Sequence, residues 1–227
     1  MIFIFDFDRT LLDTEKFKKE LCKIFDLSAK EYDSHIDEFF RKTGKHYSPE
    51  NHVKLLKKLK KIKSFSEEKK VLINYKKILK TFDTILFPEA KNILDLIKRR
   101  GDYMILITQG IPASQKRKVE GAGLKKYFSK IIYTPKKKAE NKFVLNLAKS
   151  NQKILLINDK PTEALEMQKA IGKSAEIFLV NSPHARRDKH NLKINKNIGG
   201  LKKYIVPPQR DPARGGKKLN FSQNLIR

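Results

Sequence analysis

The sequence predicts an α/β protein whose core is a doubly wound parallel sheet, with an all-helical segment inserted directly after the first strand. Three observations lead to this fold class. Short apolar runs without alternating polarity recur along the chain, as in strands that are buried on both faces of a sheet. Most of these runs are separated by stretches with helical periodicity, the pattern of β-α-β units. Between the first two runs, however, residues 14–85 carry helical patterns alone.

The first strand and the insertion follow from residue spacing. The opening run MIFIF is uniformly apolar, so it is expected to be a buried strand. Residues 28–31, Ser-Ala-Lys-Glu, form a capping box, and Pro49 suits the first turn of a helix. The helices expected in the insertion have apolar residues three or four positions apart: Phe17, Leu21, Ile24 and Phe25; Tyr32, Ile36, Phe39 and Phe40; Val53, Leu56, Leu59 and Ile62; Leu72, Tyr75, Ile78 and Leu79.

After the insertion, helices and strands are expected to alternate. In chain order we predict a helix begun by Pro88 and ended by Gly101, a strand at 103–108, a helix near 113–120, a strand at 130–133, a helix at 139–149, a strand at 153–158, a helix at 161–171 ended by Gly172, and a strand at 176–180. The core therefore comprises residues 1–13 and 86–206. Residues 207–227 are basic, contain paired prolines and glycines, and predict a disordered tail.

The chain is strongly basic, with 51 Lys and Arg against 25 Asp and Glu and a net charge of +26. Such a charge attracts phosphorylated substrates and could attract nucleic acid or acidic membranes. The lysines are spread along almost every expected helix, which favours ordinary surface solvation over a dedicated binding stripe. The opening residues lack the basic region of a signal peptide, and no apolar run approaches the roughly 20 residues of a membrane helix. We therefore expect a cytoplasmic protein without membrane association.

Polar residues that could do chemistry follow the expected strands. In open α/β sheets, ligands bind beyond the carboxyl ends of the strands. The residues found there are Asp6, Asp8 and Thr10; Thr108, Gln109 and Gly110; Lys136, Lys137 and Lys138; Asn158 and Asp159. Residues two apart on a strand project from one face, so Asp6 and Asp8 could converge on one ion or phosphate. Each group alone also fits a plain turn, but chance seldom arranges all of them on successive strand ends.

This ordered set resembles the haloacid dehalogenase superfamily of phosphatases and phosphotransferases. The family's first motif, Asp-x-Asp-x-Thr after a hydrophobic strand, is matched by Asp6, Asp8 and Thr10. Its second motif, a Thr or Ser that ends the next core strand, is matched by Thr108. The family also inserts a helical cap between these motifs, so the resemblance identifies residues 14–85 as a cap on a Rossmann-like core.

The remaining two motifs are matched less exactly. The third is a lysine ahead of a helix, for which Lys137 is preferred by its spacing and Lys138 comes next. The fourth is an acidic pair at a strand end, matched in part because Asn158 replaces the first acid and Asp159 supplies the second. Arg9 stands where many members have glycine, and we expect it to face solvent.

The resemblance implies a role for each residue. Asp6 is the nucleophile that forms an aspartyl-phosphate, and Asp8 is the general acid and base. Mg²⁺ is the implied cofactor, held by Asp6, the backbone carbonyl of Asp8, and Asp159. The residues implied in phosphate binding are Thr10, Thr108, Gln109 and the lysine, Lys137 or Lys138.

The function expected from this reasoning is Mg²⁺-dependent hydrolysis of a small phosphorylated metabolite, because a helical cap would exclude large substrates. A phosphomutase is a weaker alternative with the same chemistry. Rival hypotheses are a degenerate, non-catalytic member of the fold that binds nucleic acid, and a phosphatase acting on nucleic-acid ends. Substrate specificity would reside in the cap, where the sequence leaves open which of these side chains face the site: Tyr32, His35, Arg41, His46, Tyr47 or His52.

Overall fold

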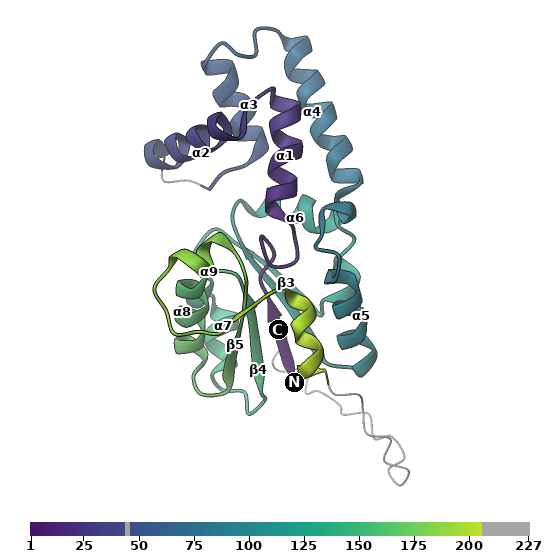
Figure 1. Cartoon of the computed structure of the whole chain (residues 1–227), viewed down its shortest axis with the longest axis vertical. Helices are drawn as coiled ribbons and strands as arrows, with labels where there is room; N and C mark the ends of the chain where they lie inside the picture. The colour runs from purple at the N-terminus through teal and green to yellow at the C-terminus, as the bar shows by residue number, and fades with distance from the viewer. Residues whose placement is uncertain (44–45, 206–227) are drawn as a thin grey trace.

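The computed structural model describes residues 1–43 and 46–205, and the predicted tail at 207–227 lies outside this range. The described chain forms a parallel sheet with helices on both faces, and a group of helices beyond one end of it (Figure 1). The sheet has six strands in the order β3-β2-β1-β4-β5-β6, which confirms the predicted doubly wound α/β fold. The strands are β1 (Ile2–Phe5), β2 (Tyr103–Gln109), β3 (Lys130–Thr134), β4 (Ile154–Asn158), β5 (Ala175–Val180) and β6 (Ile194–Asn195).

Strand β1 lies at the centre of the sheet because all four of its residues are apolar and buried. It pairs in parallel with β2 on one side and β4 on the other. Its side chains alternate between two hydrophobic cores, with Phe3 and Phe5 in one and Ile2 and Ile4 in the other. A strand buried on both faces needs no polar alternation, which explains the uniform MIFIF run.

Helices cover both faces of the sheet. Apolar residues of α5 (Ala90–Arg100) and α6 (Pro112–Gly121) join the core that contains Phe3 and Phe5, as does the 3₁₀ helix η4 (Ile198–Tyr204). Those of α7 (Lys142–Leu147) and α8 (Pro161–Ile171) join the opposite core. The remaining core elements are the 3₁₀ helices η2 (Lys125–Tyr127) and η3 (Lys138–Glu140), and α9 (Pro183–Arg187).

Residues 14–85 form the helical group, which we call the cap. It contains α1 (Thr14–Phe25), α2 (Ala29–Thr43), α3 (Pro49–Lys58), α4 (Phe65–Lys80) and the 3₁₀ helix η1 (Phe82–Ile85). The capping box is present, since Glu31 accepts hydrogen bonds from both the backbone amide and the hydroxyl of Ser28. Phe17 of α1 packs edge-on against Phe82 at a ring distance of 4.9 Å. The apolar faces of the helices thus pack against one another.

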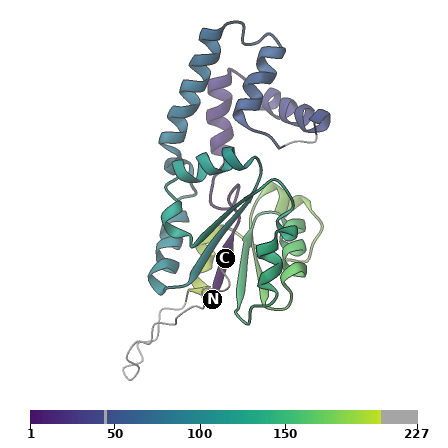
Figure 2. The same cartoon turned by 180° about the vertical axis from the view of Figure 1, so that it is seen from behind.

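The cap rests on helix α6, which lies between it and the sheet (Figure 2). Gly121 permits this contact, because a Cβ atom there would lie 2.3 Å from the carbonyl oxygen of Leu79 in α4. Arg117 of α6 forms an ion pair with Glu50 of α3. A third contact joins the two parts where the Nε2 atom of His46 lies 2.8 Å from the carbonyl oxygen of Pro135. The cap is therefore placed over the carboxyl ends of the strands.

Several details differ from the prediction, and the 3₁₀ helices η2 and η4 are among the elements that were not predicted. The helix expected at 139–149 is divided into η3 and α7, with Asn141 accepting a hydrogen bond from the amide of Phe143 as the cap of α7. Helix α9 and strand β6 were not predicted, because both are too short for their periodicity to be recognised.

Within residues 1–43 and 46–205, every helix falls short of the length and hydrophobicity that crossing a bilayer requires.

Candidate active site

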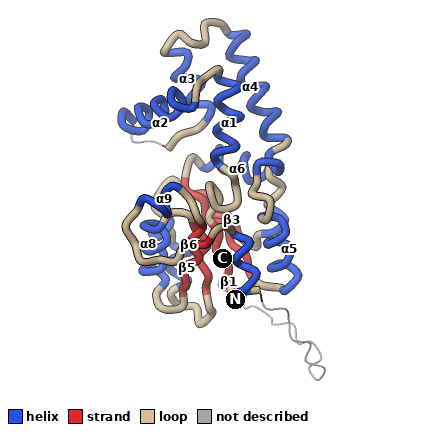
Figure 3. Tube along the Cα trace, in the orientation of Figure 1, coloured by secondary structure: helices blue, strands red, loops and turns tan. Residues whose placement is uncertain are grey.

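The candidate site lies beyond the carboxyl end of β1. The strand order reverses there, since β2 and β4 flank β1 on opposite sides, and such a switch point is where doubly wound sheets bind ligands. Figure 3 shows the strands side by side, with loops at the ends that face the cap. The ends of β1, β2, β3 and β4 that carry the predicted site residues therefore lie at one edge of the sheet.

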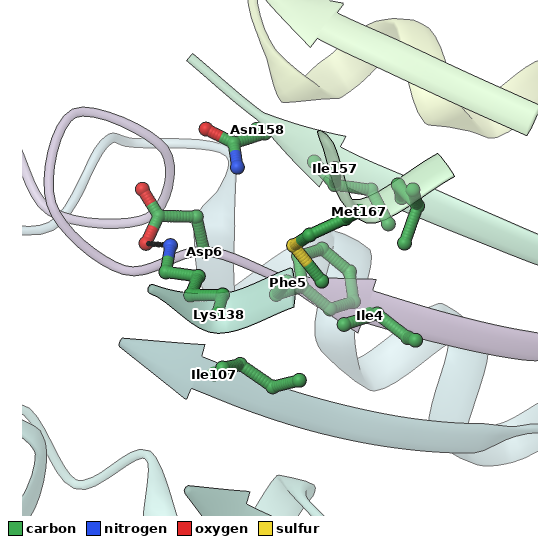
Figure 4. A pocket seen from close by; sticks show the side chains of 9 residues that line it. Ile4, Phe5, Asp6, Ile107, Lys138, Ile157, Asn158 and Met167 are labelled. Atoms are coloured by element: carbon green, nitrogen blue, oxygen red, sulfur yellow. Dashed lines mark hydrogen bonds and ion pairs between the residues drawn. The ribbon is translucent and has the colours of Figure 1, made fainter. Parts of the chain in front are cut away.

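Asp6 and Lys138 form the centre of the site. Asp6 is 9% exposed, and its backbone amide donates a hydrogen bond to the carbonyl of Ile157 at 2.8 Å, which fixes it beside β4. Lys138, only 2% exposed, extends its amine to the Asp6 carboxylate (Figure 4). A cavity of about 10 Å³, lined by both side chains, by Asn158 and by apolar residues of the sheet, lies beside this ion pair.

The structure corrects the preference for Lys137. Its side chain is 59% exposed and pairs with Glu166 at 2.9 Å on the surface of α8. Lys138 instead begins η3 and points inward to Asp6, so the turn that precedes α7 determines which lysine enters the site. Three identical side chains in a row give no periodicity from which this choice could be predicted.

Asp159 and Glu163 bring two further carboxylates to the site. Asp159 follows β4, is buried, and has an Oδ2 atom without a hydrogen-bond partner. Glu163, in the first turn of α8, accepts two hydrogen bonds of 2.7 Å, one from the Lys138 amine and one from the side-chain amide of Asn158. Sequence reasoning missed Glu163, although an acid in the first turn of a helix that follows a strand end was a usable signal. Asn158 thus holds Glu163 in place beside the lysine.

The site contains more buried negative charge than Lys138 can neutralise. Burial, with the nearby carboxylates of Glu163 and Asp159, raises the pKa of Asp6 to about 8, although Lys138 opposes this shift. Burial also raises the pKa of Asp159 to about 6. Burial would raise the pKa of Glu163 too, but Lys138 and Asn158 bring it below its usual value. A divalent cation would relieve this repulsion.

The donor set fits a magnesium ion. The described residues contain no cluster of three His, Cys, Asp or Glu side chains ready to hold a metal. Asp6 and Asp159 nevertheless offer two carboxylates, and the unpartnered Oδ2 atom of Asp159 is an available oxygen. Mg²⁺ keeps several waters and needs only one or two carboxylates from the protein when a phosphate supplies another oxygen. The chemistry of these oxygen donors therefore suits this ion.

Two buried hydroxyl groups lack hydrogen-bond partners. Thr10 and Thr108 are both 0% exposed, and the Oγ1 atom of each is unpartnered. Such groups are rare in folded proteins, and their positions in the loop after β1 and near the end of β2 suit a ligand with acceptor oxygens. Gln109, which ends β2, accepts a hydrogen bond at its backbone carbonyl from Gln115 at 2.9 Å. The two threonines can thus serve as phosphate donors.

Asp8 does not converge with Asp6 on one partner. Its carboxylate faces α6, where Lys118 Nζ lies 2.6 Å from Oδ1 and Gln115 Nε2 lies 2.8 Å from Oδ2. The expectation of a shared face fails because β1 ends at Phe5, so the period of two does not extend to residue 8. Burial would raise the pKa of Asp8, but Lys118 and Gln115 lower it below its usual value.

Arg9 is only partly turned to solvent. Its backbone is left-handed, with φ of 57°, and its amide donates to the Thr14 hydroxyl at 3.0 Å. The guanidinium lies 3.3 Å from Glu15 of α1. Its charge also acts to lower the pKa of Asp159 against the effect of burial. Arg9 therefore links the first motif to the start of the cap.

Most of the polar cap residues left open by the sequence contact one another. The hydroxyl of Tyr32 donates to that of Tyr47 at 2.9 Å, and the Tyr47 hydroxyl lies 2.8 Å from Nδ1 of His52. The Nε2 atom of His52 is 3.1 Å from Nδ1 of His35. Tyr32, His35 and His52 are buried inside the cap and Tyr47 is partly buried. His46 instead contacts the core at Pro135. The other four side chains form a structural network of the cap.

The comparisons with known proteins agree with the fold. Residues 3–175 match the haloacid dehalogenase-like hydrolase family, and the chain belongs to this family of hydrolases. No match was found among curated protein sequences.

Solved structures show the same fold at low sequence identity. A haloacid dehalogenase-like hydrolase from Burkholderia xenovorans LB400 is 18% identical, with a TM-score of 0.67 over 88% of this chain and 96% of that one. The HAD-hydrolase YfnB from Bacillus subtilis, solved with magnesium bound, is 16% identical, with a TM-score of 0.60 over 90% and 97%. A protein from Thermotoga maritima described as a β-phosphoglucomutase is 19% identical, with a TM-score of 0.52 over 86% and 88%.

Proposed function

We propose that this hydrolase is a Mg²⁺-dependent phosphatase in which Asp6 is the nucleophile. The observation that carries the proposal is the buried Asp6 carboxylate beside the Lys138 amine. The unpartnered hydroxyls of Thr10, in the loop after β1, and of Thr108, near the end of β2, add to it. An ammonium group and hydroxyl donors around a carboxylate nucleophile suit a phosphoryl group, whose transfer depends mainly on charge compensation and positioning.

The metal site in this proposal consists of the Asp6 and Asp159 carboxylates with the backbone carbonyl of Asp8. Bound Mg²⁺ supplies positive charge that compensates the phosphoryl oxygens and the crowded carboxylates. Glu163 keeps Lys138 in position, because it accepts a hydrogen bond from the same amine that contacts Asp6. The magnesium-bound Bacillus subtilis structure, which shares the fold, supports this choice of metal.

The reaction proceeds in two steps. An Asp6 oxygen attacks phosphorus, the bond from phosphorus to the substrate oxygen breaks, and that oxygen takes a proton from Asp8. Because the pKa of Asp8 is low, this carboxylate first receives the proton from the phosphate group of the bound substrate. Water then attacks the aspartyl-phosphate, with Asp8 accepting its proton. The bond from phosphorus to the Asp6 oxygen breaks, phosphate leaves, and the Asp6 carboxylate is restored.

The proposed substrate is a small phosphorylated metabolite. The cap lies over the strand ends and contacts the core through Glu50 and His46, so a bulky substrate would have to displace it. A nucleic-acid substrate is less favoured on this ground, despite the net charge of +26. We also propose a cytoplasmic location, in keeping with such a substrate.

Initial rates with p-nitrophenyl phosphate and Mg²⁺ test the proposal. The wild type should hydrolyse the ester, and Asp6→Asn should be inactive while keeping its circular dichroism spectrum. The matched control is Asp188→Asn, which changes an acid beyond α9 and should keep wild-type activity. Equal rates for wild type and Asp6→Asn would rule out Asp6 as the nucleophile. Isomerised substrate in place of free phosphate would indicate a phosphomutase.

A further inference from the structure

The carboxylate of Asp8 is held by two donors from one helix. Lys118 and Gln115 lie three residues apart on α6, so both project from the same face of the helix. Lys118 reaches Oδ1 at 2.6 Å and Gln115 reaches Oδ2 at 2.8 Å, so each carboxylate oxygen has its own donor. These contacts fix both the position and the rotation of the carboxylate plane.

The position of Gln115 is itself fixed by β2. The nitrogen that donates to Asp8 also donates to the carbonyl of Gln109 at 2.9 Å. Gly110 leaves room for this arrangement, because a Cβ atom there would lie 2.8 Å from the same nitrogen. Gln115 is 5% exposed, so it connects the end of β2 with Asp8 away from solvent.

Lys118 is not an ordinary surface lysine. It is 8% exposed, and its amine lies 5.4 Å from the centre of the Phe7 ring and 6.0 Å from that of Phe17 in the cap. The Asp8 side chain is 29% exposed, so the pair is partly removed from water, and ion pairs that lose hydration add little stability over apolar residues of similar size. A contribution to stability therefore explains this ion pair poorly. A need to hold the Asp8 carboxylate in one orientation explains it better.

We propose that Lys118 and Gln115 are positioning residues that orient the Asp8 carboxylate towards the water that hydrolyses the aspartyl-phosphate. This inference rests on the phosphatase function proposed above. In the second step, water oxygen bonds to phosphorus, one water proton passes to Asp8, and the bond from phosphorus to Asp6 breaks. Two donors fixed on α6 leave the remaining lone pairs of Asp8 directed away from that helix, so a water there is met by an oriented base.

The test uses Lys118→Met with p-nitrophenyl phosphate and Mg²⁺. Methionine keeps the packing against Phe7 and Phe17 but removes the donor. Since p-nitrophenolate leaves with little protonation, the first step should be nearly unchanged while the second becomes slow. We expect kcat to fall by about tenfold or more, KM to fall with it, kcat/KM to stay within about threefold, and a rapid burst of one p-nitrophenol per enzyme to appear.

The matched control is Lys116→Met, on the same helix, which changes a lysine with a 61% exposed side chain and should leave kcat, KM and the burst as in the wild type. Gln115→Met removes the second donor and should show the same pattern more weakly. It carries the test if Lys118→Met does not fold.

The outcomes separate this inference from the proposed function. An unchanged kcat in the variants, or a fall in kcat/KM with KM constant and no burst, would overturn the positioning role while leaving the phosphatase function intact. Absence of hydrolysis by the wild type would reject the phosphatase function, and the positioning role with it.

Discussion

Acidification from pH 7 to pH 4 should destabilise the cap through one imidazole, that of His52. This side chain is 1% exposed, and its two ring nitrogens lie against the Tyr47 hydroxyl and the His35 ring. Phe25 of α1 packs against it at a ring distance of 4.6 Å, and Tyr32 of α2 at 5.1 Å. Burial lowers the pKa of His52 to about 4, and the charges of His35 and Lys61 act in the same direction.

The size and sign of the effect follow from this pKa. An unfolded chain binds a proton at His52 near pH 6.5, whereas the folded chain does so only near pH 4. Between these values the unfolded state binds more protons, so stability is lost as the pH falls from 6.5 to 4. At about 1.4 kcal/mol per pKa unit, the loss is roughly 3 kcal/mol, a large part of the usual 5–15 kcal/mol for a folded protein.

Urea unfolding followed by circular dichroism at pH 7 and pH 4 measures this loss. His52→Gln is the comparison, because an amide can form hydrogen bonds but does not titrate in this range. Asp6 and Asp159, whose raised pKa values have the opposite effect on stability, are present in both proteins and cancel in the difference. Between pH 7 and pH 4 the wild type should lose about 3 kcal/mol more than His52→Gln. Equal losses would refute the reasoning.

Three further predictions concern the site and its support. Asp159→Asn should raise the Mg²⁺ concentration for half-maximal activity by at least about tenfold, measured in a magnesium titration, and an unchanged requirement would contradict its role as a ligand. Lys138→Met should lower kcat/KM about 100-fold, while the matched change Lys137→Met should alter it less than about twofold. Similar effects of the two substitutions would contradict the assignment of Lys138 as the lysine that acts in the site. Gly121→Ala should lower the free energy of unfolding, measured in urea, by about 1–3 kcal/mol, because the added methyl group would clash with the Leu79 carbonyl. An unchanged free energy of unfolding would show that the two helices can move apart at no cost.

The sheet could be predicted because each strand carries its own signal. Runs such as residues 153–158 are apolar on both faces and end in a turn, and β4 occupies Ile154–Asn158 accordingly. The ends of some helices could be predicted as well, since α8 begins at Pro161 and ends before Gly172, as its sequence indicates. Strand β6 has two residues, and no periodicity can be read from so short an element.

The candidate site was predictable only where a residue's place depends on its own strand. Thr108 lies near the end of β2 and Asp159 directly follows β4, and both are buried at the expected edge. The contacts of Asp8 were not predictable, because Lys118 is 110 residues away in sequence and is brought close by the packing of α6. Glu163 was missed, and Lys138 was placed second to Lys137, for a similar reason, since a helix start and a 3₁₀ turn determine which way these side chains point.

Locating a phosphoryl group during turnover tests the central claim most directly. The enzyme would be mixed with substrate and Mg²⁺, quenched in acid and digested, and its peptides examined by mass spectrometry. We predict one phosphoryl group on Asp6 in the wild type and none on the corresponding peptide of Asp6→Asn. Hydrolysis by the wild type with Asp6 unmodified, or with the phosphoryl group on another residue, would contradict the account.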